Sequence, residues 1–224
     1  MIRLVVVLAM ALSAGIAHAQ IAADPEKATQ FNTLIEKAHA AIGHWAYNTQ
    51  LDVMRAKLAA GFELSKLERA RMGTMALNRG CPIEAEAALA PLAATGEFGG
   101  PQDPERRVNA AVLKKAQLDA EADRTGDLLR RENLAPQLAT GKLFLVTGEA
   151  HFAIGDYEKA LELIQKGIAK GGLPKEDVPF AHLQLGIAQY RTGRVSEART
   201  TWKAIWSDRG ARELAQAWLV IAGD

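Results

Sequence analysis

The sequence has a single cysteine, Cys81, among its 224 residues, so an intramolecular disulfide is excluded. It also lacks an excess of charge, because 27 basic residues are balanced by 26 acidic ones. That balance gives no bulk attraction to nucleic acid or to anionic lipid, and we expect neither as a partner. Beyond the N-terminus no apolar run is long enough to span a bilayer, so no membrane span is expected in the mature chain. Stability must therefore come from the burial of side chains.

Recognisable catalytic and metal-binding motifs are missing as well. The chain has no H-E-x-x-H pair, no cysteine cluster, no G-x-S-x-G nucleophile and no phosphate-binding loop. The mature histidines lack the spacing of metal ligands, and we expect His151 to be a half-buried residue at a helix interface. No base or second thiol lies near Cys81 in the sequence, which favours a structural role in a tight turn. The sequence therefore predicts no enzyme, no cofactor and no metal site.

The N-terminal residues are typical of a secretory signal peptide. Arg3 supplies a positive start, residues 4–16 form an almost unbroken apolar run, and residues 17–19 (Ala-His-Ala) fit a small-x-small cleavage site. The run is short for a transmembrane helix, which makes an uncleaved anchor the weaker alternative. We predict a signal peptide over residues 1–19 and export to the periplasm of a Gram-negative bacterium, with secretion by another kind of cell as the alternative.

The mature chain alternates apolar-periodic segments with glycine and proline, which is typical of an all-α fold. Phe31, Leu34, Ile35 and Ala38 recur at helical spacing, whereas the alternation expected of strands is missing. We expect about ten helices in antiparallel pairs. The predicted regions are an N-terminal helical repeat region (20–100), a charged helical spacer or degenerate repeat (101–140), and C-terminal repeats with a capping helix (141–224). A loop is expected over residues 93–107, and a helix break near Gly126.

Three segments repeat the same arrangement of small and large residues. Each has a glycine early in its first helix, a glycine turn, and then a large apolar residue in its second helix. Small residues let two helices approach closely, and a large residue fills the groove so formed. The three sets are Gly73, Gly80 and Leu89; Gly148, Gly155 and Ile164; and Gly186, Gly193 and Trp202.

These segments resemble the tetratricopeptide repeat, and the C-terminal part of the chain is similar to exported proteobacterial tetratricopeptide proteins of unassigned function. The likeness is carried by GDYEKALELIQKGIAKGGL and LQLGIAQY. It implies an α-solenoid of antiparallel helix pairs, a tetratricopeptide-like superhelix. An aromatic residue that the family pattern places after the first glycine comes one position late, as Phe152 and Tyr190.

The resemblance also implies a binding groove lined by the first helix of each pair. Carried onto this sequence, the groove positions belong to three hairpins and include charged, amide and aromatic side chains. They are Arg71, Thr74, Asn78, Lys142, Glu149, Phe152, Gln184, Ile187, Tyr190 and Arg191. Such side chains can hold a peptide backbone or a carboxylate by hydrogen bonds.

We therefore expect a periplasmic scaffold that binds an unidentified protein or peptide, with a possible place in envelope assembly. Two alternatives stay open, namely a helical-solenoid enzyme acting on cell-wall material and an obligate structural subunit of an envelope complex. The enzyme would need a deep pocket that holds a carboxyl of raised pKa. The four tryptophans, Trp45, Trp202, Trp206 and Trp218, lie on apolar stripes, which favours core positions over carbohydrate platforms.

Overall fold

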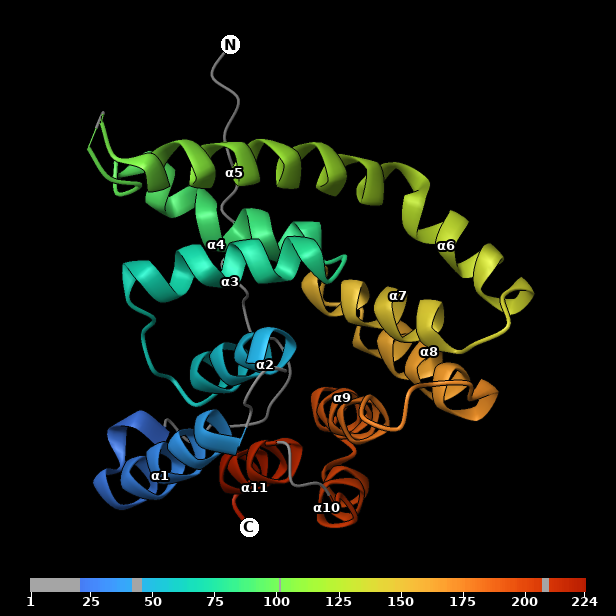
Figure 1. The fold of residues 1–224 in the computed structure, drawn as a ribbon. Coiled ribbons are helices and arrows are strands. Elements are labelled where there is room, and N and C mark those ends of the chain that lie inside the picture. Colours follow the sequence, from blue (N-terminus) through green and yellow to red (C-terminus); the bar gives the residue numbers. More distant parts are fainter. Residues whose placement is uncertain (1–20, 42–45, 101, 207–209) are drawn as a thin grey trace.

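The computed structural model describes residues 21–41, 46–100, 102–206 and 210–224, and this part of the chain is all-helical (Figure 1). The predicted signal peptide, His44 and Trp45 lie outside the described residues. The helices are η1 (Ile21–Ala23), α1 (Pro25–Ala41), α2 (Ala46–Ala59), α3 (Lys66–Asn78), α4 (Pro82–Ala94), α5 (Pro104–Ala122), η3 (Asp123–Asp127), α6 (Leu128–Leu134), η4 (Ala135–Gln137), α7 (Lys142–Ala153), α8 (Tyr157–Lys170), α9 (Val178–Arg191), α10 (Val195–Lys203) and α11 (Ala211–Ile221). None of these helices combines the length and the apolar character needed to cross a membrane.

The three repeated segments form the hairpins α3–α4, α7–α8 and α9–α10, and their glycines occupy equivalent places. A Cβ atom added to Gly73 would lie 2.4 Å from Leu89 Cγ, and one added to Gly186 would lie 2.2 Å from Trp202 Nε1. In the second hairpin, α7–α8, a Cβ on Gly148 would lie 2.8 Å from a side-chain carbon of Ile164. The predicted packing of a small residue against a large one is thus confirmed in each hairpin.

The turns of the three hairpins are also alike. Gly80, Gly155 and Gly193 all have φ between 76° and 82°, a left-handed conformation that glycine adopts without steric cost. In the first turn the Gly80 amide donates to the Leu77 carbonyl, and the Cys81 amide donates to the Ala76 carbonyl. The same two hydrogen bonds recur at the same offsets in the other turns, as in a Schellman motif. The hairpins therefore repeat in backbone geometry as well as in side-chain packing.

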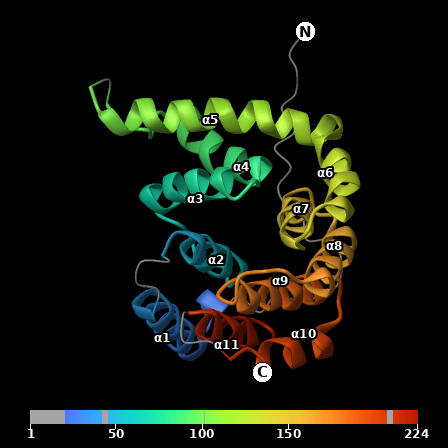
Figure 2. The same ribbon diagram turned by 45° about the vertical axis from the view of Figure 1, so that its right-hand side comes forward.

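The two ends of the described chain pack against each other. Helix α11 lies against α1, and it also contacts α2 and α9 (Figure 2). The predicted capping helix over residues 209–222 corresponds to α11, which buries Leu214 and Trp218. Its apolar face is covered by the N-terminal helices as well as by α10. The described helices consequently form a closed arrangement around a common interior, in which α2, α3, α7 and α9 converge.

The segment between the first and second hairpins contains helices α5 and α6. Helix α5 begins at Pro104, where the Asp103 carboxylate caps it by accepting from the Glu105 amide at 2.9 Å. The predicted loop over residues 93–107 is therefore shorter, since α4 extends to Ala94. The predicted break near Gly126 is confirmed by the π-helical turn η3, where Gly126 has a φ of 132°. Helices α5 and α6 together arch over one side of the molecule (Figure 1).

The largest apolar core joins the N-terminal helices to the C-terminal ones. It contains Phe31 from α1, Val53 from α2, and the aromatic group Tyr190, Trp202 and Trp218. The expectation that the tryptophans are core residues is confirmed for Trp202 and Trp218. It is wrong for Trp206, which is 84% exposed because it follows the end of α10.

Candidate functional site

A cavity of about 230 Å³ lies between the end of α3, the α7–α8 hairpin and the first half of α9. One wall is apolar and includes Leu145, Ile164 and Phe180. The other is polar, with amide and charged groups from three helices, and the Thr49 side chain reaches it from α2. The polar lining residues are Thr49, Asn78, Arg79, Lys142, Glu149, Glu176, Asp177 and Gln184.

Four of the ten predicted groove residues come together in this cavity. They are Asn78 from α3, Lys142 and Glu149 from α7, and Gln184 from α9. Asn78 and Lys142 are exposed, whereas Glu149 and Gln184 are buried. The four residues belong to the first helices of three different hairpins, so equivalent positions of the repeat meet in one cavity.

The other six predicted residues do not line the cavity. Arg71 is exposed on α3, and the Thr74 hydroxyl donates to the Ala70 carbonyl within the same helix. Ile187 and Tyr190 are buried in the largest apolar core. Phe152 and Arg191 both contact Tyr157 of the α7–α8 hairpin: the two rings are 6.2 Å apart, and the guanidinium lies 5.8 Å from the Tyr157 ring centre.

Beside the cavity lies a network of charges, which we call the ionic network: Asp52, Arg55, Arg79, Glu84 and Glu149. Asp52 and Glu149 are buried, the other three side chains are 13–14% exposed, and Arg79 and Glu149 also line the cavity. Arg55 of α2 makes a bidentate pair with Glu84 of α4, with Nε to Oε1 at 2.8 Å and Nη2 to Oε2 at 2.6 Å. Its Nη1 donates to Asp52 Oδ1 and to Glu149 Oε2, both at 3.0 Å. Bidentate arginine–carboxylate pairs fix orientation as well as distance. Arg55 thereby links α2, α4 and α7.

Arg79 completes the network from the C-terminal end of α3. Its Nε and Nη2 pair with the two oxygens of Glu149 at 2.8 and 2.9 Å, and its Nη1 donates to Asp52 Oδ2 at 3.0 Å. Asp52 also accepts from Gln184 Nε2 at 2.8 Å, which ties α9 to the same group. The network therefore holds the helices that line the cavity at fixed positions relative to one another.

The electrostatics of this interior keep both arginines charged. Burial acts to lower the pKa of Arg79, but the neighbouring Asp52 and Glu149 carboxylates outweigh it and raise that pKa above its usual value. The pKa of Arg55 is likewise raised, chiefly by Glu84 and Glu149 against the effect of burial. The two guanidinium groups meet three carboxylates, so the ionic network carries a formal excess of one negative charge.

Cys81 lies at the edge of the ionic network and is fully buried. Its Sγ is 3.7 Å from Arg55 Nη2, which donates to it. Burial raises the pKa of the thiol to about 12, against the opposing influence of the Arg55 charge. A thiol of such high pKa is a poor nucleophile at neutral pH, which agrees with a structural role in the turn between α3 and α4.

Sequence reasoning missed Asp52, Arg55, Arg79 and Glu84. The signal that points to them is local, because Asp52 and Arg55 interrupt the apolar residues Leu51, Val53 and Met54 of α2. Charged residues inside an apolar stretch need partners when buried. The sequence gives no indication of which partners those are, since Glu149 and Gln184 come from distant parts of the chain.

In the part of the chain that the structure describes, no group of three or more His, Cys, Asp or Glu side chains is arranged to hold a metal ion. His151 is buried rather than half-buried. Its Nε2 lies 3.1 Å from Glu132 Oε1, and Lys159 pairs with the other oxygen of the same carboxylate at 3.0 Å. This contact joins α6 to the α7–α8 hairpin, which is a structural role.

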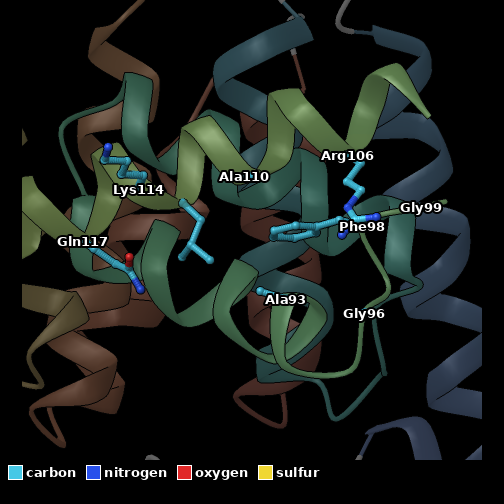
Figure 3. A pocket seen from close by; sticks show the side chains of 9 residues that line it. Ala93, Gly96, Phe98, Gly99, Arg106, Ala110, Lys114 and Gln117 are labelled. Carbon is cyan, nitrogen blue, oxygen red and sulfur yellow. The ribbon is translucent and has the colours of Figure 1, made fainter. Parts of the chain in front are cut away.

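A second, larger cavity of about 540 Å³ lies between the Gly96–Gly99 turn and the first half of α5 (Figure 3). It is more open than the first cavity. It shares no residue with that cavity or with the ionic network. Its walls carry Phe98, Arg106, Lys114 and Gln117.

Comparison with known proteins identifies no relative. No protein-family model, no curated protein and no solved structure matches the chain. The function proposed below is therefore argued from the residues that line the smaller cavity and from their geometry.

Proposed function

We propose that the protein is an exported scaffold of the tetratricopeptide type, which binds a protein or peptide segment in the groove formed by its helix hairpins. The observation that carries the proposal is the convergence of Asn78, Lys142, Glu149 and Gln184 on one cavity. All four positions follow from the repeat register alone. Their meeting in one cavity is expected if the hairpins share a concave side. The N-terminal residues, typical of a signal peptide, support a periplasmic location.

The cavity offers two kinds of contact to an extended segment. The amide of Asn78 suits backbone groups of a peptide, and the ammonium of Lys142 suits a carboxylate. The apolar wall formed by Leu145, Ile164 and Phe180 accommodates an aliphatic or aromatic side chain. At about 230 Å³ the cavity is smaller than a typical drug-sized ligand site, which favours one side chain of a larger partner as its occupant.

Site-specific photocrosslinking in the native compartment tests this proposal. A photoreactive residue is placed at Lys142, at the cavity, and as a matched control at Lys166, which is exposed on α8 and does not line the cavity. We expect a discrete adduct from the cavity position only, in the periplasmic fraction. The affinity of the purified adduct partner should then fall at least tenfold with N78A/K142A and stay unchanged with K166A. Equal labelling at both positions, or equal affinities, would contradict the proposed groove.

The enzyme alternative receives no support from Glu149, one of the three acidic residues that line the cavity. Glu149 forms ion pairs with both arginines of the ionic network, and it cannot approach a substrate without breaking those ion pairs. Burial raises the pKa of Asp123, against the influence of Arg131, but Asp123 lines neither cavity. The arrangement thus favours binding over acid–base chemistry.

One observation favours the alternative of an obligate structural subunit. Val108, Leu118 and Leu129 expose 57%, 65% and 61% of their surface on α5 and α6. Scattered apolar residues are common on surfaces, so the patch alone does not require a partner. Sedimentation of the isolated protein separates the two proposals: a stable, monodisperse monomer supports the scaffold, and concentration-dependent aggregation supports the subunit.

A further inference from the structure

The second cavity has the features of a binding site that is separate from the proposed groove. Figure 3 shows Phe98 and Arg106 at one end of it and Lys114 and Gln117 at the other. Leu113, a buried residue of α5, also lines the cavity. At about 540 Å³ it falls within the size range of sites for small organic molecules.

The cavity's polar residues share one face of α5. Arg106, Ala110, Lys114 and Gln117 follow one another at helical spacing, and all four line the cavity. Because a helix rises 1.5 Å per residue, the backbones of Arg106 and Lys114 are about 12 Å apart along the axis. A single anionic group therefore pairs with only one of the two cations, and the rest of an elongated ligand lies along the cavity between them.

The positive charges of this cavity are not compensated. Neither Arg106 nor Lys114 has an ion pair or a side-chain hydrogen bond to any residue that the structure describes. The acidic residues around the cavity have other contacts or lie outside its lining: Glu97 pairs with Lys66 at 2.6 Å, Asp103 caps α5, and Asp119 pairs with Lys115 at 2.7 Å. Glu105 precedes Arg106 in sequence but does not line the cavity. Two free cations beside an aromatic ring and a leucine form a surface that is both positive and apolar.

We propose that this cavity binds a small amphipathic anion, in which a carboxylate, sulfonate or phosphate is joined to an aromatic or aliphatic body. The anionic group pairs with Arg106 or Lys114, and the apolar body lies against Phe98 and Leu113. Gly96 and Gly99 leave the rim without side chains, so that a ligand can approach from the solvent. The site is independent of the groove proposed above, with which it shares no residue.

Fluorescence titration with two matched probes tests the proposal. The probes are 8-anilinonaphthalene-1-sulfonate and its uncharged analogue N-phenyl-1-naphthylamine, added to the folded mature protein. We expect saturable binding of the sulfonate at a single site, at least tenfold tighter than binding of the uncharged probe. Removing both cations with R106Q/K114Q should weaken sulfonate binding at least tenfold and leave the uncharged probe unaffected. F98A should weaken the binding of both probes.

The control variant is R107Q/K115Q, which makes the same change of charge one position further along the same helix. Both residues are exposed, neither lines the cavity, and Lys115 pairs with Asp119 at 2.7 Å. It should bind the sulfonate within twofold of the parent protein. The proposal is overturned if the parent protein gives no saturable signal, or if both double variants lose affinity equally. Equal affinity for both probes would also overturn it, because the cations would then contribute nothing.

Discussion

The molecule has two interiors of opposite character, and both join the N-terminal helices to the C-terminal ones. In the aromatic core, the rings of Tyr190, Trp202 and Trp218 contact one another, with centroid distances of 5.8 to 6.2 Å. In the ionic network, Arg55 and Arg79 meet three carboxylates. The first consists of apolar surface removed from water, and the second of directional, charge-assisted hydrogen bonds.

The difference indicates what each interior contributes. Apolar burial is non-directional and supplies most of the stability. A buried ion network gives little net stability, because the cost of removing charges from water offsets the attraction between them. The directional hydrogen bonds of such a network do require its side chains to take one relative arrangement. Here those side chains come from the helices around the smaller cavity. We interpret the aromatic core as the source of stability and the ionic network as the device that positions the cavity.

The largest effect is expected in the aromatic core. W202A removes a fully buried ring that fills the space over Gly186, and it should lower the free energy of unfolding by about 4 kcal/mol. The matched control is W206A, because Trp206 is 84% exposed and should contribute less than about 0.5 kcal/mol. Urea denaturation followed by circular dichroism measures both. Similar losses in the two variants would show that Trp202 is not in the core.

The next largest effect is expected in the ionic network. R79M leaves Asp52 and Glu149 buried with one cation fewer, which should cost about 3 kcal/mol in urea denaturation. The control is R124M, which removes an ion pair between the partly exposed side chains of Arg124 and Glu86 and should cost less than about 1 kcal/mol. If R79M were as mild as R124M, the network would not be buried as described.

A smaller effect tests the repeat itself. G73A places a methyl group 2.4 Å from Leu89 Cγ, and the resulting strain should cost about 2 kcal/mol. In a background that already carries L89A the same change should cost close to nothing, because the contacting side chain is gone. The comparison uses the unfolding free energies of the four variants of this cycle. An unchanged cost in the L89A background would mean that the two residues do not face each other.

The reactivity of the Cys81 thiol reports on the burial of this residue without any substitution. With a folded-state pKa of about 12 against an ordinary value of 9.0, the thiolate fraction at pH 8 should be about a thousandfold lower than in the unfolded chain. Native protein should therefore react slowly with a thiol reagent, and urea-unfolded protein rapidly. Since the folded pKa is raised, this contribution to stability is complete below pH 9 and is lost as the pH rises towards 12. Rapid labelling of native protein would contradict the burial.

The hairpins could be predicted from the sequence because their determinants are local. Gly148 and Ile164 belong to one pair of adjacent helices, and the positive φ of Gly155 follows from its place in the turn. Four of the ten predicted groove residues line one cavity for the same reason, since the register within each hairpin determines which side of the helix a residue faces. The break near Gly126 also follows from a local signal.

The ionic network and the contact between the chain ends could not be predicted, because they depend on residues far apart in sequence. Nothing near Asp52 indicates that Gln184 will bond to it. Ile187 and Tyr190 were expected in the groove, yet they lie in the core because α11 packs against α9 and encloses them. The repeat pattern describes contacts within and between neighbouring hairpins, and it has no information on a helix that returns from the far end of the chain.

Arg79 of the first hairpin and Glu149 of the second meet in the ionic network. A double-mutant cycle with R79M and E149Q tests this contact most directly, using free energies of unfolding from urea denaturation. We predict a coupling energy of about 2 kcal/mol, because each single change already breaks the bidentate pair. Additive effects, with a coupling below about 0.5 kcal/mol, would contradict the account.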